Sequence, residues 1–143
     1  MMKKFTKWSF VFAVLAMVSG VFYREFTKFN DFTGTTALGY THVHLFTLGA
    51  MFLLIAGLIS EKWTLEPYQS FRWFQRLFLI GLPFMTVMFY VRGILQVLGT
   101  ELTRMQDAAI SGIAGLSHIM LAAGIVAFYL ALKKAIPQQE NAN

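Results

Sequence analysis

The chain has 143 residues, of which 57% are apolar and 13% charged, and its net charge is +5. This is too little charge to coat a water-soluble globule of that size, so the composition excludes an ordinary soluble domain and predicts a lipid bilayer as the main partner. The basic residues stand at the ends of apolar stretches, which argues against a nucleic-acid partner. Because cysteine is absent, disulfides, thiolate metal sites and iron–sulfur clusters are excluded.

Four apolar stretches predict one transmembrane domain, residues 1–136, with an all-α fold. We expect an integral membrane four-helix bundle that runs up-down-up-down, because each stretch reaches the roughly 20 residues needed to cross the hydrocarbon and backbone groups in lipid must be satisfied within the helix. The first stretch could instead be a secretory signal, but its apolar character continues past a possible cleavage site at Gly20. The predicted helices are at about residues 5–27, 37–60, 73–98 and 107–133, and a disordered polar tail follows at residues 137–143.

The distribution of Lys and Arg predicts the orientation of the helices. Eight basic residues flank the side that carries both termini and the second loop, and four flank the opposite side. Because cytoplasmic flanks carry the excess of basic residues, we expect both termini in the cytoplasm of a bacterium and a multi-pass protein of its inner (cytoplasmic) membrane.

Two segments match in a gapless register: Gly39-Tyr40-Thr41-His42-Val43-His44-Leu45 and Gly115-Leu116-Ser117-His118-Ile119-Met120-Leu121. Further on, Phe52 matches Phe128, and the first and third stretches both end in Phe-Tyr followed by an arginine. This pattern indicates a duplicated two-helix unit with its axis along the membrane normal, which would place His42 and His118 at equal depth. The alternative is coincidence, since small residues, Phe and Leu are common in membrane helices.

The three histidines of the chain, His42, His44 and His118, all lie in these segments. An imidazole within a membrane predicts a functional site, although a hydrogen bond between helices is the alternative. At about 100° per residue His42 and His44 point about 200° apart, which disfavours a compact three-histidine zinc or copper site. Two ligands on opposing helices suit the axial positions of haem b. His42 with His118 is the symmetric pair, and His44 with His118 stays open as the other.

Three further side chains are candidates for the same site. Arg92 lies inside the outer end of the third stretch, where it could neutralise a haem propionate, with Arg24 as its counterpart in the first half. The alternative for Arg92 is snorkelling to the surface or an ion pair with Glu25 or Glu101. Tyr40 lies near the same level and could add a hydrogen bond or only mark the interface.

The layout of four spans, with Thr-His-Val-His in the second and Gly-Leu-Ser-His in the fourth, resembles a family of small bacterial membrane proteins of unknown function over nearly the whole chain. The His-x-His is also similar to a helix in subunit I of haem-copper oxidases, where neighbouring histidines serve two different haems. That resemblance implies that His42 and His44 address separate sites and that His118 completes one of them. The copper-ligand histidines have no match, so oxygen reduction is not implied. Four-helix membrane cytochromes b are similar in architecture, but usually carry four ligands.

The sequence therefore predicts a membrane protein that binds haem b through axial histidines and serves electron transfer or haem handling in respiration, with quinol or a respiratory oxidase as candidate partner. One alternative is a non-catalytic haem carrier or oxidase-assembly factor, and another is a cofactor-free structural or transport protein. Whether a reaction is catalysed stays open; an enzyme of this kind would be a membrane haem oxidoreductase. A homodimer also stays open, because it would let an unpaired histidine find a ligand on a second chain.

Overall fold

The computed structural model describes residues 1–140, and within them the regular structure is entirely helical. The elements are α1 (Met2–Phe29), α2 (Leu38–His44), η1 (Leu45–Phe52), α3 (Leu53–Lys62), α4 (Gln69–Val97) and α5 (Arg104–Glu140). Because α2, η1 and α3 follow one another without a break, the described chain forms 4 helices long and apolar enough to cross a membrane. This confirms the predicted all-α, four-helix membrane fold.

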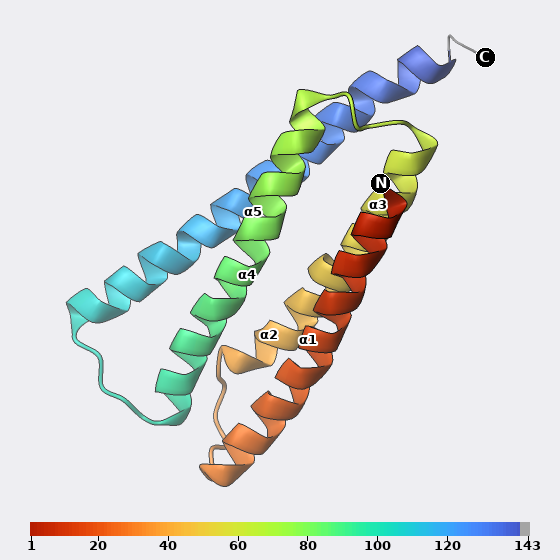
Figure 1. Cartoon of the computed structure of the whole chain (residues 1–143). Coiled ribbons are helices and arrows are strands. Elements are labelled where there is room, and N and C mark those ends of the chain that lie inside the picture. The colour runs from red at the N-terminus through yellow and green to blue at the C-terminus, as the bar shows by residue number, and fades with distance from the viewer. Residues whose placement is uncertain (141–143) are drawn as a thin grey trace.

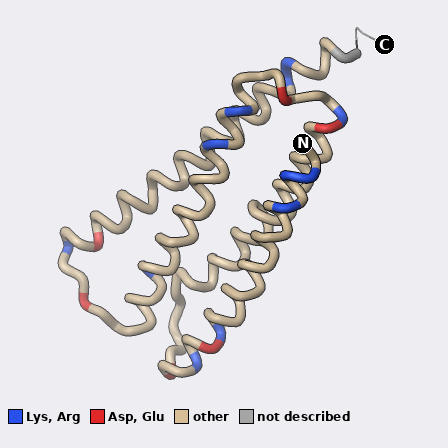
Figure 2. The backbone as a smooth tube through the Cα atoms, in the orientation of Figure 1, with Lys and Arg blue, Asp and Glu red and all other residues tan. Residues whose placement is uncertain are grey.

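The helices pack as two hairpins (Figure 1). One hairpin places α1 along α2, η1 and α3, the other places α4 along α5, and α2 with η1 joins the first hairpin to α4. The start of α1 and the end of α5 lie at one end of the bundle, here called the terminal end, and the loops at 30–37 and 98–103 lie at the other, the distal end. Figure 2 shows that the charged residues gather toward these two ends and leave the middle uncharged, as a bilayer requires.

Two glycines of the second span let α1 approach closely. A Cβ atom on Gly49 would lie 2.6 Å from the Cβ atom of Phe12, and one on Gly57 would lie 2.7 Å from the Cβ atom of Phe5. Small residues allow helix backbones to come together in a membrane, where packing rather than hydrophobic burial drives association. The two Phe–Gly contacts therefore fix how α1 lies along the second span.

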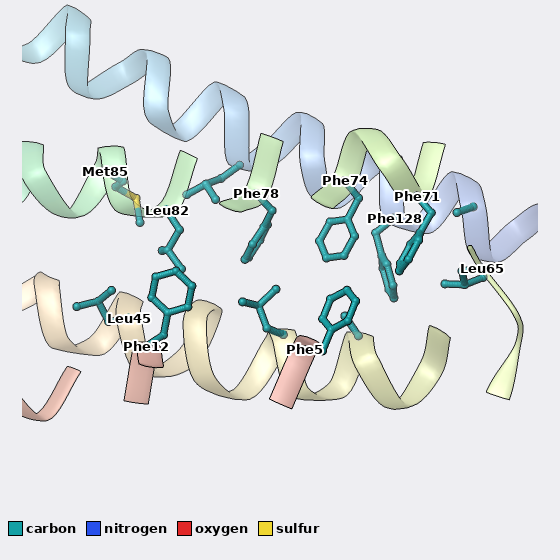
Figure 3. Close-up of a cluster of buried hydrophobic side chains, with 14 of the residues drawn as sticks. Phe5, Phe12, Leu45, Leu65, Phe71, Phe74, Phe78, Leu82, Met85 and Phe128 are labelled. Carbon is teal, nitrogen blue, oxygen red and sulfur yellow. The ribbon is translucent and has the colours of Figure 1, made fainter. Parts of the chain in front are cut away.

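Aromatic rings fill the core toward the terminal end (Figure 3). Rings from all four spans take part: Phe5, Phe52, Phe71, Phe74, Phe78 and Phe128. The rings of Phe52 and Phe128, which occupy matched positions in the two segments of the sequence, meet edge to face with 5.8 Å between their centroids. The two matched phenylalanines thus join the second and fourth spans across the core.

The ends of α4 and α5 differ from the prediction by a few residues. α4 begins at Gln69 rather than near residue 73, because Phe71 and Phe74 are fully buried and draw the first turn into the bundle. α5 begins at Arg104 rather than at 107 because a capping box precedes it. In that box the Gln106 amide donates to Thr103 Oγ1 over 3.3 Å, and the Thr103 amide donates to Gln106 Oε1 over 3.0 Å.

The C-terminal end of α5 also extends further than expected. The helix continues through Pro137 to Glu140, so the part of the predicted disordered tail at 137–140 is helical, and residues 141–143 lie outside the described chain. Pro137 has no amide to donate to the carbonyl of residue 133 and its ring crowds that carbonyl, so the last turn continues at a cost to helix stability.

The middle of the second span is a π-helix, η1, which no pattern in the sequence predicts. A π turn holds one more residue than an α turn, so residues before it are rotated relative to residues after it. The Ser9 hydroxyl of α1 donates to the Ala50 carbonyl inside η1 over 2.7 Å, in a buried position. Neighbouring side chains commonly satisfy backbone groups where a helix departs from α geometry. The contact with α1 therefore supports the irregular segment.

Candidate functional site

The residues just before α2 are hydrogen-bonded to α4. Thr36 Oγ1 donates to the Gly93 carbonyl over 2.9 Å, and the Ala37 amide donates to Gln96 Oε1 over 2.7 Å. A Cβ atom on Gly93 would lie only 2.5 Å from the backbone nitrogen of Leu38. Because glycine alone leaves room for so close an approach, α2 and α4 touch backbone to backbone. This contact positions the histidines that follow on α2.

Phe89 of α4 lies one turn from Gly93 and is the meeting point of two histidines. Its ring centroid is 5.0 Å from that of His44 and 6.0 Å from that of His118. The imidazole planes are inclined to the phenyl plane by 59° and 76°. Tyr40 also contacts this phenyl ring, at 6.2 Å between centroids. The structure thus brings His44 of the second span and His118 of the fourth to one flat ring.

These two histidines are held in the same way by their own helices. His44 Nδ1 lies 2.8 Å from the carbonyl oxygen of Tyr40, and His118 Nδ1 lies 3.0 Å from that of Ala114. A carbonyl oxygen only accepts hydrogen bonds, so each Nδ1 carries a proton, and in a neutral imidazole Nε2 then keeps its lone pair. Metal-binding imidazoles in proteins are commonly oriented by a hydrogen bond of this kind.

His42 faces α1 instead. Its ring stacks on that of Tyr23 at 6.4 Å and 15°, and a Cβ atom on Gly20 would lie 3.7 Å from it. Its Nδ1 is buried and has no hydrogen-bond partner. The sequence left two pairings open. His44 and His118 share Phe89 as a neighbour, whereas His42, which matches His118 in the repeat, lies against α1. In the part of the chain that the structure describes, no three His, Asp or Glu side chains gather where they could hold a metal ion.

The π-helix explains why the matched histidines do not face each other. His42 precedes Phe52 by as many residues as His118 precedes Phe128, so two regular α-helices would point both histidines alike. The additional residue in the turns of η1 rotates α2 by about 100° relative to Phe52. This rotation carries His42 toward α1 and His44 toward α4, while Phe52 and Phe128 still meet.

Arg92 lies one turn beyond Phe89 toward the distal end and joins α4 to α5. Its Nη2 is 3.1 Å from Asp107 Oδ1 and donates to Ser111 Oγ over 2.6 Å. The partner is therefore Asp107, not Glu25 or Glu101 as the sequence suggested. Because Ser111 lies two turns before His118 on α5, the guanidinium stands directly beyond the imidazole pair.

Arg24 forms its ion pair on its own helix and not with the residues around Arg92. Its Nε lies 3.8 Å from Glu25 Oε1 on the same helix, and its side chain is 80% exposed. At that exposure an ion pair contributes little, because water and salt screen it. The predicted pairing of Arg24 with Arg92 at one ligand thus finds no support in the contacts of either side chain.

The surface of α5 beside His118 is open. His118 is exposed, and Cβ atoms on Gly112 and Gly115 would meet nothing within 4 Å. Gly115 is one turn from His118, so a flat group could lie against the helix there. Phe89, Ser111 and Asp107 were not predicted as parts of this site. The only signal for Phe89 is the Phe-Tyr pair that ends both the first and the third spans.

Fold and geometry define a four-span, all-α membrane protein in which two imidazoles from different spans contact the same phenyl ring. The chain belongs to the family described as protein of unknown function (DUF2871), whose model matches residues 2–135. This confirms the predicted membership in a family without a known activity. No curated protein and no solved structure matches the chain, and the comparisons show no likeness to haem-copper oxidases or cytochromes b.

Proposed function

We propose that the protein binds haem b between the second and fourth spans, with His44 and His118 as axial ligands, and that it serves electron transfer or haem handling in a bacterial respiratory membrane. One observation carries the proposal. Two imidazoles from different spans approach the same flat ring at steep angles, each with Nδ1 held by its own helix and Nε2 unprotonated. Axial ligands of haem require this donor atom and this steep approach to a plane.

The surroundings fit a haem in three respects. Phe89 and Tyr40 supply aromatic walls, and the bare surface at Gly112 and Gly115 leaves space beside His118. Arg92 stands where it could exchange Asp107 for a propionate carboxylate, a charge-assisted contact of the kind that arginine favours. Because Phe89 contacts both imidazoles, haem binding to His44 and His118 would require its ring to turn away. The bound group would supply one-electron chemistry, and the chain would supply the ligands and the counter-charge.

The membrane and the orientation are part of the proposal. The terminal end carries eight of the basic residues and the distal end four, which supports a cytoplasmic location for both termini and an outer location for the histidines in a bacterial inner membrane. A quinol or a respiratory oxidase would then be the electron partner. Separate roles for His42 and His44 are part of the proposal, because the first lies against Tyr23 of α1 and the second against Phe89 of α4, and oxygen reduction is not implied.

The test is an absorption spectrum of protein purified from a haem-sufficient host. We expect a Soret band that is lost in His44→Ala and in His118→Ala and retained in His42→Ala, which is the matched control because it removes the same side chain from the same helix. Added imidazole should restore part of the band in the first two variants. A wild-type protein that stays colourless after haemin titration, or a band that depends on His42 and not on His44, would refute the proposal.

Haem handling by a carrier, rather than fixed electron transfer, is favoured by one observation: His118 is exposed on α5 and could release its ligand readily. Mixing the haem-loaded protein with apo-myoglobin separates the two functions. Transfer of the Soret signal to the globin within minutes indicates a carrier. Retention over hours indicates a cytochrome, because a ligand held by two histidines leaves slowly.

A further inference from the structure

His42 lines an open groove between α1 and the second span. The other residues that line it are Ala16, Met17, Gly20, Val21 and Phe46. Met17, Val21 and Phe46 are exposed at 60%, 64% and 49%, so in a membrane they contact acyl chains. The groove therefore opens sideways to the hydrocarbon, and the imidazole is the polar group in its lining. A polar group in such surroundings is costly unless a partner satisfies it.

The hydrogen bonding of His42 differs from that of the other two histidines. His44 and His118 place Nδ1 on a carbonyl of their own helix, but the Nδ1 of His42 is buried without a partner. Buried donors without partners are rarer than buried acceptors without partners, so the proton of neutral His42 belongs on Nε2. This nitrogen is not among the buried unpartnered atoms. His42 thus offers an N–H donor to the groove, whereas the other two offer lone pairs.

The neighbours of His42 suit a flat ligand with oxygen acceptors. Tyr23 stacks on the imidazole at 15°, and Gly20 leaves the facing surface of α1 without a side chain. His42 is four residues from the start of α2, which places it roughly 6 Å into the span. The head group of a lipid-soluble ligand could therefore reach it near the membrane surface.

We propose that this groove binds the head group of a quinone from the lipid phase, with the Nε2–H of His42 donating to a quinone carbonyl oxygen. A quinone is flat and apolar, carries carbonyl acceptors and enters sideways from the bilayer. An acyl chain would fill the same space but leave the N–H unpaired in hydrocarbon, at a cost that a carbonyl oxygen removes. As the electron partner of a haem at His44 and His118 the quinone would deepen the proposed function, but its binding to His42 does not require haem.

The probe is decylubiquinone in phospholipid nanodiscs, and the measurement is the quinone retained per chain, corrected for empty nanodiscs. We expect saturable binding of one quinone to the wild type. His42→Phe, which keeps a ring but removes the donor, should weaken binding about tenfold, the effect of one good hydrogen bond. His42→Gln, which keeps an N–H donor, should recover part of it. Gly20→Leu, which fills the groove, should abolish it, and circular dichroism reports whether each variant is folded.

Thr47→Val is the matched control, because it removes a hydrogen-bond donor from the same span but outside the groove. It should bind quinone like the wild type. Non-saturable partitioning, or equal affinity in the wild type and His42→Phe, overturns this inference. The two proposals fail separately: a Soret band without quinone binding removes only the quinone site, and quinone binding that depends on His42 in a colourless protein removes only the haem.

Discussion

Replacing Gly93 by Ala should separate α2 from α4. The new Cβ atom would lie 2.5 Å from the backbone nitrogen of Leu38 and 2.6 Å from its Cγ, and backbone cannot rotate away as a side chain can. Such overpacking costs about 1–3 kcal/mol. The shift would also lengthen the hydrogen bonds from Thr36 to Gly93 and from Ala37 to Gln96, each of which contributes about 0.5–1.5 kcal/mol. We expect a total loss of about 2–6 kcal/mol in the free energy of unfolding.

The assay is reversible unfolding of the purified protein in mixed micelles, followed by far-ultraviolet circular dichroism. Gly112→Ala is the matched control, because its Cβ atom would enter open space and Ala is the better helix former. It should be as stable as the wild type or slightly more stable. In a haem-loaded sample only Gly93→Ala should also weaken the Soret band, since His44 moves with α2. Equal stability of the two variants would refute the proposed docking of α2 on α4.

Three further outcomes are expected. Phe89→Ala should raise the rate of haemin binding in stopped-flow absorbance, because the phenyl ring that contacts His44 and His118 no longer has to move. Slower binding would show that this ring supports the haem. Arg92→Gln should weaken haem affinity about tenfold in a Soret titration, the effect of one charge-assisted contact, whereas Arg24→Gln should leave it unchanged; equal effects would remove Arg92 from the site. Ser9→Ala should lower the free energy of unfolding by about 1 kcal/mol, because the Ala50 carbonyl loses a buried donor; no change would show that η1 does not depend on this contact.

The four spans could be predicted from the sequence because hydropathy and length decide them in a bilayer, where no other structure of that length satisfies the backbone. Their ends could be predicted less well. The start of α4 depends on the burial of Phe71, a tertiary contact, and the start of α5 on a capping box at Thr103 and Gln106 whose spacing could have been recognised.

The partner of His118 could not be derived from sequence. Matched register favoured His42, and the structure places His44 beside Phe89 because η1 interrupts the helix between the histidines and Phe52. The Ala50 carbonyl in that segment bonds to Ser9 on another helix, and neither residue carries a local signal for a π turn. Phe89 was not predicted as part of the site for a different reason. An aromatic residue in a membrane span faces lipid or the core far more often than a ligand site.

Loops tolerate changes of chain length, whereas a residue gained or lost within a helix turns one part of it by about 100° relative to the other. The second span already contains such a turn, because η1 sets the direction of α2, and with it of His44, relative to Phe52. A single codon lost there would straighten the helix and turn both imidazoles by about 100°, so that His44 leaves Phe89 although neither histidine is altered. The number of residues in this span therefore matters to the site as much as their identity, as the spacing of apolar residues matters in a coiled coil.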